Sequence, residues 1–162
     1  MFAFQLTGEL PSSLFECVKL FNVNFVDCGF SGAIPATIAG MKELSIFNCK
    51  NCKLSGELPP EMGSLANIAH INLEANELTG ELPSTLEQCA FKSIDLSDNQ
   101  FTGEIPDGLF NGSASTLEIC DLGGNQFSGM LPSSLVKCTA LQTLDLAKNE
   151  VRGTPSLTAF VF

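Results

Sequence analysis

The sequence predicts a solenoid of the α/β class, in which about six repeats of about 24 residues each add one short strand to a parallel sheet. Two observations predict it. A Gly-x-Leu/Ile-Pro element recurs along nearly the whole chain, and an alternating apolar pattern ending in Asn or Cys precedes it. The intervals between successive frame glycines are 24, 24, 24, 23, 26 and 24 residues, for Gly8, Gly32, Gly56, Gly80, Gly103, Gly129 and Gly153.

The strand of each repeat is expected where apolar and polar residues alternate. The pattern L-x-x-L-x-L-x-x-N is clearest from Leu141 to Asn149. Alternation with a period of two turns the leucines inward and the intervening residues to solvent. Stacked copies then form a parallel sheet whose solvent-facing residues make columns across the repeats.

A second column occupies the place just after the strand, where the chain turns inside the solenoid. Asparagine there can satisfy backbone groups that water cannot reach, and cysteine takes its place in two early repeats. The following Gly permits a backbone conformation closed to other residues, Pro starts the return segment, and the x-x-L after it indicates a helical turn. The predicted structural ladder is Cys28, Cys52, Asn76, Asn99, Asn125 and Asn149.

At these residues the sequence resembles the plant-type leucine-rich repeat class of receptor-like kinases, receptor-like proteins and polygalacturonase-inhibiting proteins. The resemblance implies a right-handed superhelix with a concave parallel β-sheet, a second short strand around the L-x-G-x-I-P element, and short helical or irregular convex segments. It covers residues 1–162 as a single leucine-rich repeat domain. The amino-terminal cysteine-paired cap of the family is missing, so neither end has an evident cap and self-association through the ends is possible.

Composition excludes several classes of partner. The chain has 18 acidic and 8 basic residues, and its net charge of -10 repels nucleic acid phosphates. No apolar stretch is long enough for a membrane span, and Leu157 to Phe162 is far too short, so we expect no direct membrane insertion. The opening residues 1–4 lack the basic and apolar regions of a signal peptide.

No constellation points to catalysis, a cofactor or a metal. All seven cysteines fall on positions that the repeat predicts to be buried, where free thiols act as small apolar groups. Cys49 and Cys52 form a C-x-x-C pair without the second pair that a zinc site needs. His70 is the single histidine and faces solvent, with no nucleophile placed by a motif. We therefore expect a protein that is not an enzyme.

Recognition is expected on the concave face, where the resemblance implies that protein or peptide ligands bind. Exposed apolar residues near the start give way to carboxylates near the end, which favours an amphipathic ligand with a basic portion. The alternative is that the acidic residues only keep the surface soluble and that contacts lie elsewhere in a longer array. The candidate contacts are Phe21, Asn22, Asn24, Val26, Asn48, Lys50, His70, Asn72, Glu74, Asp95, Asp121 and Asp145.

Two further surface features are predicted outside this face. A line of glutamates follows the frame glycines and should lie on the flank as a solvating row: Glu9, Glu57, Glu81 and Glu104. Asn111, Gly112 and Ser113 form an N-glycosylation sequon in the repeat with two extra residues, which should bulge as an exposed loop.

The functional hypothesis is a protein or peptide recognition module of a receptor-like leucine-rich repeat protein, extracellular or at the cell surface. One alternative is a secreted inhibitor of a cell-wall-degrading enzyme. Another is the regulatory segment of a receptor kinase, because kinase signatures are missing from this chain. A purely structural role through end-to-end stacking is the remaining one.

Overall fold

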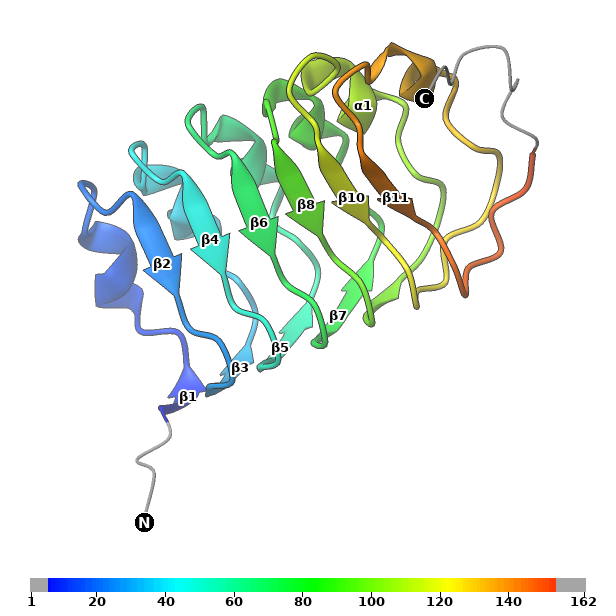
Figure 1. Ribbon diagram of the computed structural model, residues 1–162. Helices are drawn as coiled ribbons and strands as arrows, with labels where there is room; N and C mark the ends of the chain where they lie inside the picture. Colours follow the sequence, from blue (N-terminus) through cyan, green and yellow to red (C-terminus); the bar gives the residue numbers. More distant parts are fainter. Residues whose placement is uncertain (1–5, 154–162) are drawn as a thin grey trace.

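The computed structural model describes residues 6–153, and these form a solenoid with two parallel sheets on different sides (Figure 1). The larger, six-stranded sheet has the order β11-β10-β8-β6-β4-β2 and lines the concave face. Its strands are β2 (Asn22–Asn24), β4 (Ile46–Asn48), β6 (His70–Asn72), β8 (Ser93–Asp95), β10 (Ile119–Asp121) and β11 (Thr143–Asp145).

The second sheet runs through the L-x-G segment of each repeat, where the resemblance implied a short strand. It has five strands in the order β1-β3-β5-β7-β9 and lies along the lower flank in Figure 1. Its strands are β1 (Thr7–Glu9), β3 (Gly29–Gly32), β5 (Lys53–Gly56), β7 (Glu77–Gly80) and β9 (Gln100–Phe101).

Short helices close each repeat on the side opposite the larger sheet. A frame proline directly precedes each 3-10 helix. The prolines before η2, η3 and η4 have extended backbone, and their rings hold φ near the value that the following helix needs. The 3-10 helices are η1 (Ser12–Glu16), η2 (Ala36–Gly40), η3 (Pro60–Ser64), η4 (Ser84–Gln88) and η5 (Ser133–Lys137), and the single α-helix of the described residues is α1 (Gly108–Gly112).

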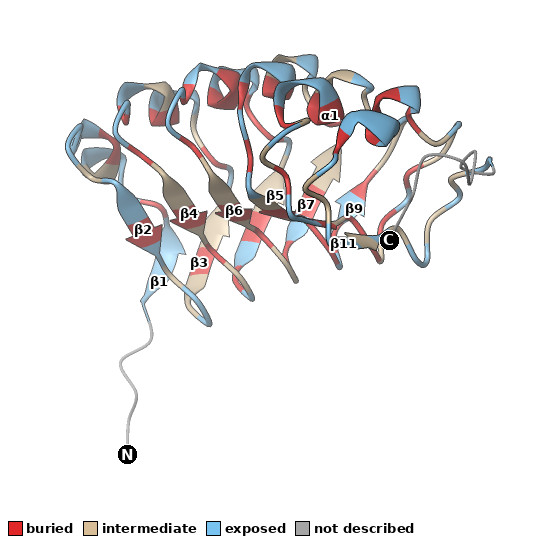
Figure 2. Ribbon diagram, turned by 45° about the horizontal axis from the view of Figure 1, so that its top comes forward, coloured by how far each residue is buried: buried red, intermediate tan, exposed pale blue. Residues whose placement is uncertain are grey.

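The core is one continuous column between the sheets and the helices, and the buried residues follow it in Figure 2. The middle residue of each strand of the larger sheet points inward, and Phe47, Ile94 and Cys120 are completely buried there. The strand pattern read from the alternation of residues is therefore confirmed. Phe101 and Phe127 add a stacked pair of rings at a centroid distance of 6.0 Å.

The two extra residues of the fifth interval, between Gly103 and Gly129, do not make the exposed loop that we expected. The chain forms α1 there, and Leu109 and Phe110 are buried against the core. Ser113 is fully buried, and its hydroxyl is satisfied there: it donates to Cys89 O at 3.3 Å and accepts from Phe91 N at 2.9 Å. The insertion is absorbed as a full helical turn because it supplies two apolar side chains to bury.

The expectation that all seven thiols are buried is wrong for two of them. Cys17 is exposed and Cys28 is half-buried, whereas Cys49, Cys52, Cys89, Cys120 and Cys138 are buried. Cys17 and Cys28 lie in the first layers of the described residues, where fewer described repeats pack around a side chain than in the middle of the stack. All seven thiols are free.

Residues 1–5 and 154–162, which include the segment from Leu157 to Phe162, lie outside the described part of the chain. Within residues 6–153, no helix has the length and apolar character needed to cross a bilayer.

Candidate functional site

The asparagine ladder holds the strand ends of the concave sheet in register. Asn99 donates from Nδ2 to Leu73 O of the preceding repeat at 2.9 Å and to Leu96 O of its own repeat at 3.1 Å. Its Oδ1 accepts from Leu78 N at 3.1 Å. Asn76, Asn125 and Asn149 make the same contacts one repeat apart. One side chain thus satisfies backbone groups of two repeats, which rigidifies the face beside it.

The two cysteine rungs reproduce only part of this pattern. Cys52 Sγ donates to Phe25 O of the preceding repeat at 3.1 Å, the bond that the asparagine amide makes elsewhere. Cys28 Sγ contacts Val26 O within its own repeat at 3.7 Å. A thiol has one weak donor where an amide has two, so the ladder is weaker in the first two repeats.

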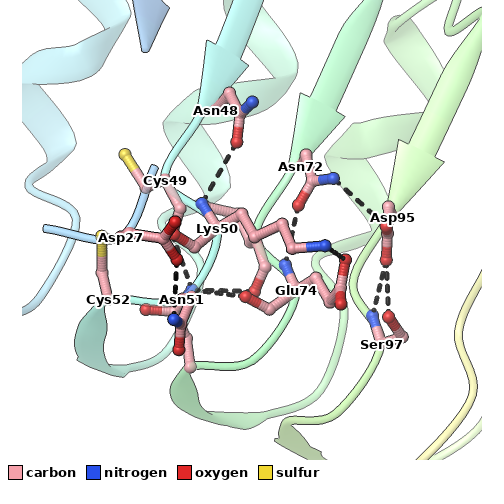
Figure 3. Close-up of polar contacts among 12 residues, drawn as sticks. Asp27, Asn48, Cys49, Lys50, Asn51, Cys52, Asn72, Glu74, Asp95 and Ser97 are labelled. Atoms are coloured by element: carbon pink, nitrogen blue, oxygen red, sulfur yellow. Dashed lines mark hydrogen bonds and ion pairs between the residues drawn. The ribbon is translucent and has the colours of Figure 1, made fainter. Parts of the chain in front are cut away.

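The middle column of the concave face is engaged in turns, a role that the sequence reasoning missed. Asn48 Oδ1 accepts from Lys50 N and Asn72 Oδ1 from Glu74 N, each at 3.1 Å, and Asp95 Oδ1 accepts from Ser97 N at 3.1 Å (Figure 3). Asp121 and Asp145 accept in the same way from the backbone two residues on. The sequence did carry a signal for these turns: each repeat has an Asn or Asp two residues before the backbone N–H that its side chain accepts from.

Each turn also needs a left-handed residue directly before the ladder position. Positive φ values occur at Asp27, Asn51, Ala75, Asp98 and Lys148, and Gly124 takes that place in the fifth repeat. Asn and Asp tolerate this conformation because their short side chains bond locally, which explains their abundance there. The local sequence alone does not distinguish this need from a need for ligand contacts.

Four of the predicted contact residues form two polar pairs near β4, β6 and β8 (Figure 3). Lys50 Nζ lies 2.6 Å from Glu74 Oε2, and this carboxylate raises the pKa of the lysine through the hydrogen bond between them. Asn72 Nδ2 donates to Asp95 Oδ2 at 3.2 Å. His70 is half-buried on β6, beside this network.

An acidic hollow of about 230 Å³ opens beside the ends of β10 and β11. Glu74, Asp98, Asp121 and Asp145 line it, and Lys148 is its one cation. Burial raises the pKa of the Asp121 carboxyl, and the nearby charges of Asp95, Asp145 and Glu74 add to this, against the hydrogen bond from Gly123. This acidic hollow thus concentrates negative potential on the concave face.

The opposite end of the concave face is apolar. Phe21 is 63% exposed and Val26 is 38% exposed beside β2, where Asn22 and Asn24 are also exposed. The structure therefore places the predicted contacts in three groups: an apolar end, a central network of paired polar groups, and the acidic hollow. Glu74 belongs both to the central network and to the lining of the hollow, and the Lys50 side chain keeps 41% of its surface exposed beside their ion pair.

The buried thiols are unsuited to nucleophilic chemistry. Burial raises the pKa of Cys89 to about 11 and raises those of Cys49 and Cys120 further. Among residues 6–153, no group of His, Cys, Asp and Glu side chains is arranged to hold a metal ion. Asn111 is exposed on α1, and its Oδ1 accepts from Lys137 Nζ at 2.9 Å, so glycosylation there stays a prediction.

Comparison with known families matches two stretches of the chain to leucine-rich repeat models. Residues 89–151 and residues 43–65 match, and both matches lie on repeats that the structure shows to be stacked in one solenoid. The chain belongs to the leucine-rich repeat proteins. A comparison with curated protein sequences finds no match.

Solved structures similar to this leucine-rich repeat chain include plant receptor ectodomains. The PEPR1-AtPEP1 structure is 30% identical over 91% of this chain and 21% of that one, with a TM-score of 0.86. The Arabidopsis receptor kinase HAESA ectodomain, solved with an extended IDA peptide hormone ligand, is 29% identical over 92% of this chain and 25% of that one, also with a TM-score of 0.86. The chain spans about a fifth to a quarter of these proteins.

A smaller ectodomain matches over a larger share of its own length. The BIR2 ectodomain from Arabidopsis thaliana is 28% identical, covers 82% of this leucine-rich repeat chain and is itself covered to 69%, with a TM-score of 0.71. The repeat class and the plant type that the sequence indicated are therefore confirmed.

Proposed function

We propose that this chain is a peptide or protein recognition module within a receptor-like leucine-rich repeat ectodomain, and that it works outside the cell or at its surface. The observation that carries this is the match of 92% of the chain to the HAESA ectodomain, which was solved with a peptide hormone ligand. The repeat scaffold supplies a rigid, continuous surface, which supports binding as its function.

The ligand lies across the strands of the concave sheet in this proposal. Five spacings of about 4.8 Å separate β2 from β11, so the face is about 24 Å long and accommodates about seven residues of extended chain. An apolar residue of the ligand would contact Phe21 and Val26. A lysine, an arginine or the terminal amine would enter the acidic hollow.

The carboxylates of Asp121 and Asp145 remain able to bind a cation although each accepts a turn hydrogen bond. The turn uses Oδ1 in both residues, and no group of the described residues donates to the second oxygen of either. A ligand ammonium at this point would lie near several carboxylates at once. Its contribution depends on ionic strength, because the hollow is open to water.

Binding to an array of synthetic peptides tests this proposal. We expect the selected peptides to combine apolar and basic residues and to bind several-fold more weakly to the Asp121→Asn, Asp145→Asn double variant. The matched control removes two carboxylates from the convex side, with Glu16→Gln and Glu61→Gln, and should bind as the unchanged chain does. Selected peptides that bind both variants and a Phe21→Ala variant equally well would overturn the concave-face assignment.

A further inference from the structure

A groove on the flank of the solenoid is separate from the concave face. It has a volume of about 990 Å³ and lies where β5 and β7 lead into η3 and η4, and it extends to the segment after β9. Three consecutive repeats form its walls. No lysine or arginine lines it.

One wall of the groove is a row of glutamates. Glu57, Glu81 and Glu104 follow the frame glycines of successive repeats, and all three are exposed. The other lining residues are mostly apolar or small: Leu58 and Leu82 are buried beneath the groove, and the apolar surface is presented by Pro60, Pro83 and Pro106. The groove therefore joins an anionic edge to an apolar floor, which is more than a solvating surface needs.

The glutamate side chains are held in place by the next repeat. A Cβ at Gly80 would lie 2.6 Å from Glu57 Cγ, and a Cβ at Gly103 would lie 2.7 Å from Glu81 Cγ. Glu104 lies against Gly129 in the same way. Each stem thus crosses the bare glycine of its neighbour, so the row loses less side-chain freedom when a ligand binds than free surface glutamates would. Glycine is therefore needed at these frame positions for two reasons: the backbone has a positive φ, and the glutamate stem leaves no room for a side chain.

The spacing of the row fits one kind of occupant. Neighbouring parallel strands lie about 4.8 Å apart, so Glu57 and Glu104, two repeats apart, are separated by about 9.6 Å along the solenoid. A polyproline II helix rises about 3.1 Å per residue and repeats every three residues, which gives about 9.3 Å. Basic side chains at every third residue would therefore meet alternate glutamates, while the residues between them contact Pro60, Pro83 and Pro106.

We propose that this flank groove binds an extended, polyproline II polypeptide segment that carries lysine or arginine at every third residue. The inference goes beyond the proposed function, because the groove is on the second sheet and shares no residue with the concave contacts. It accounts for three features together: the groove without cations, the ordered glutamate row and the apolar floor.

Fluorescence anisotropy with a labelled peptide of repeated Arg-Pro-Pro triplets tests the proposal. We expect saturable binding that weakens as ionic strength rises, and no binding of a peptide of Glu-Pro-Pro triplets. The Glu57→Gln, Glu81→Gln, Glu104→Gln variant should weaken binding on the order of fivefold, as the loss of the two exposed ion pairs at Glu57 and Glu104 predicts. Glutamine keeps the stems on the glycines, so thermal melting should show an unchanged fold.

Three comparisons make the result decisive. A matched variant with Glu16→Gln, Glu43→Gln and Glu87→Gln removes the same charge elsewhere and should bind as the unchanged chain does. Ser84→Arg places a cation in the groove and should also weaken binding. If the matched variant loses as much affinity as the groove variant, the attraction is general and the groove proposal fails. If only Asp121→Asn with Asp145→Asn weakens binding, the peptide occupies the concave face, which overturns the groove proposal and leaves the proposed function standing.

Discussion

The buried ladder side chains show how single residues decide the stability of this solenoid. Asn99 is 8% exposed and donates to three carbonyl oxygens while accepting from one amide. Water has no access to most of these backbone groups, so each would lose a partner with the side chain. The ladder is thus a set of cross-repeat bonds that no apolar residue of the same size can replace.

Replacing Asn99 with alanine should lower the free energy of unfolding by about 2–4 kcal/mol, because it leaves Leu78 N and several carbonyl oxygens without partners. Urea unfolding followed by circular dichroism measures this. Asn99→Cys should cost less than Asn99→Ala, since Cys52 makes one of the ladder bonds through its thiol. Gln126→Ala, at an exposed position, is the control and should be near neutral. Equal losses for all three variants would contradict the ladder's role.

Asp121 should make stability depend on pH in a defined direction. Its pKa is raised in the folded state by burial first and then by neighbouring carboxylates, so its ionised form carries a cost at neutral pH. Asp121→Asn should therefore raise the melting temperature at neutral pH. The corresponding gain in the free energy of unfolding should be less than about 1 kcal/mol. The gain should shrink as pH falls toward the ordinary range of aspartate, near about 3.9. Thermal melts across this pH range measure it.

Asp107 provides the opposite case. The pKa of its carboxyl is lowered, chiefly because the backbone N–H of Ser134 donates to it, with Ser133 and the Ser134 hydroxyl contributing. This stabilisation is present above the ordinary aspartate pKa and disappears as pH falls through the lowered value. Asp107→Asn should therefore melt lower than the unchanged chain at neutral pH, with a difference that vanishes in acid. A gain at neutral pH would contradict the assignment.

At the scale of elements, the helices and strands of adjacent repeats approach more closely where glycine permits it. Gly112 ends α1 against the segment after η4, and a Cβ there would meet Glu87 O and would lie 2.6 Å from Cys89 O. Both atoms belong to the backbone, which cannot move as a side chain can. The α-helix of the longer repeat thus packs closely against η4 only because residue 112 is glycine.

Gly112→Ala should destabilise the protein by about 1–3 kcal/mol through overpacking of α1 against its neighbour. Ala is otherwise the better helix former, so propensity alone predicts a gain and the two explanations have opposite signs. Gly123→Ala, whose Cβ would lie at least 3.2 Å from its neighbours, should cost less. Chemical unfolding of both variants separates the explanations, and a stabilised Gly112→Ala variant would rule out the close approach.

The whole molecule is a stack in which each repeat contacts only its neighbours, so stability varies along it. Leu144 and Leu146 in the last described repeat are half-buried, whereas their counterparts Ile94 and Leu96 are completely buried. Among residues 6–153, an end layer packs against one neighbouring layer only, and its strand has one neighbour in the larger sheet, so less of its apolar surface is buried. The middle repeats are therefore the stable part of the chain.

Hydrogen exchange should follow this gradient. Amides of β6 and β8 should exchange more slowly than those of β2 and β11, because the middle strands open only with the whole stack. Exchange measured by mass spectrometry on peptides from each repeat tests it. Uniform protection from β2 to β11 would mean that the ends are as well covered as the centre.

Association through the open end layers stays a prediction that solution measurements check. Leu141, Leu144 and Leu146 in the last described layer pack against the core but stay half-buried, and exposed Phe21 and Leu6 lie near the other end of the described residues. Sedimentation velocity over a range of concentrations should show a growing fraction of larger species. Replacing Leu144 with glutamate should reduce that fraction, and an unchanged monomer at all concentrations would reject self-association.

The repetition of the sequence made much of this architecture predictable. The period placed the strands, the inward residues such as Phe47, and the helical turn after each proline, because these depend on patterns that recur within one repeat. The errors fell where the repeat frame stopped applying. Cys17 and Cys28 lie in the first layers of the described residues and are not buried, and the insertion before Ser113 became a helix and not a loop.

The sequence by itself determined the solenoid, the two columns of residues and the acidic character of one face, since short-range periodicity dictates which side chains turn inward. Only the tertiary structure decided which polar residues are free. Five residues of the middle column accept a turn hydrogen bond, but of these Asn72 and Asp95 are also paired with each other, whereas Asp121 and Asp145 border an open hollow. The physical reason is that stacking brings together residues that lie about one repeat apart in the sequence. Burial, the crowding of like charges and the flank groove all arise from these contacts between repeats.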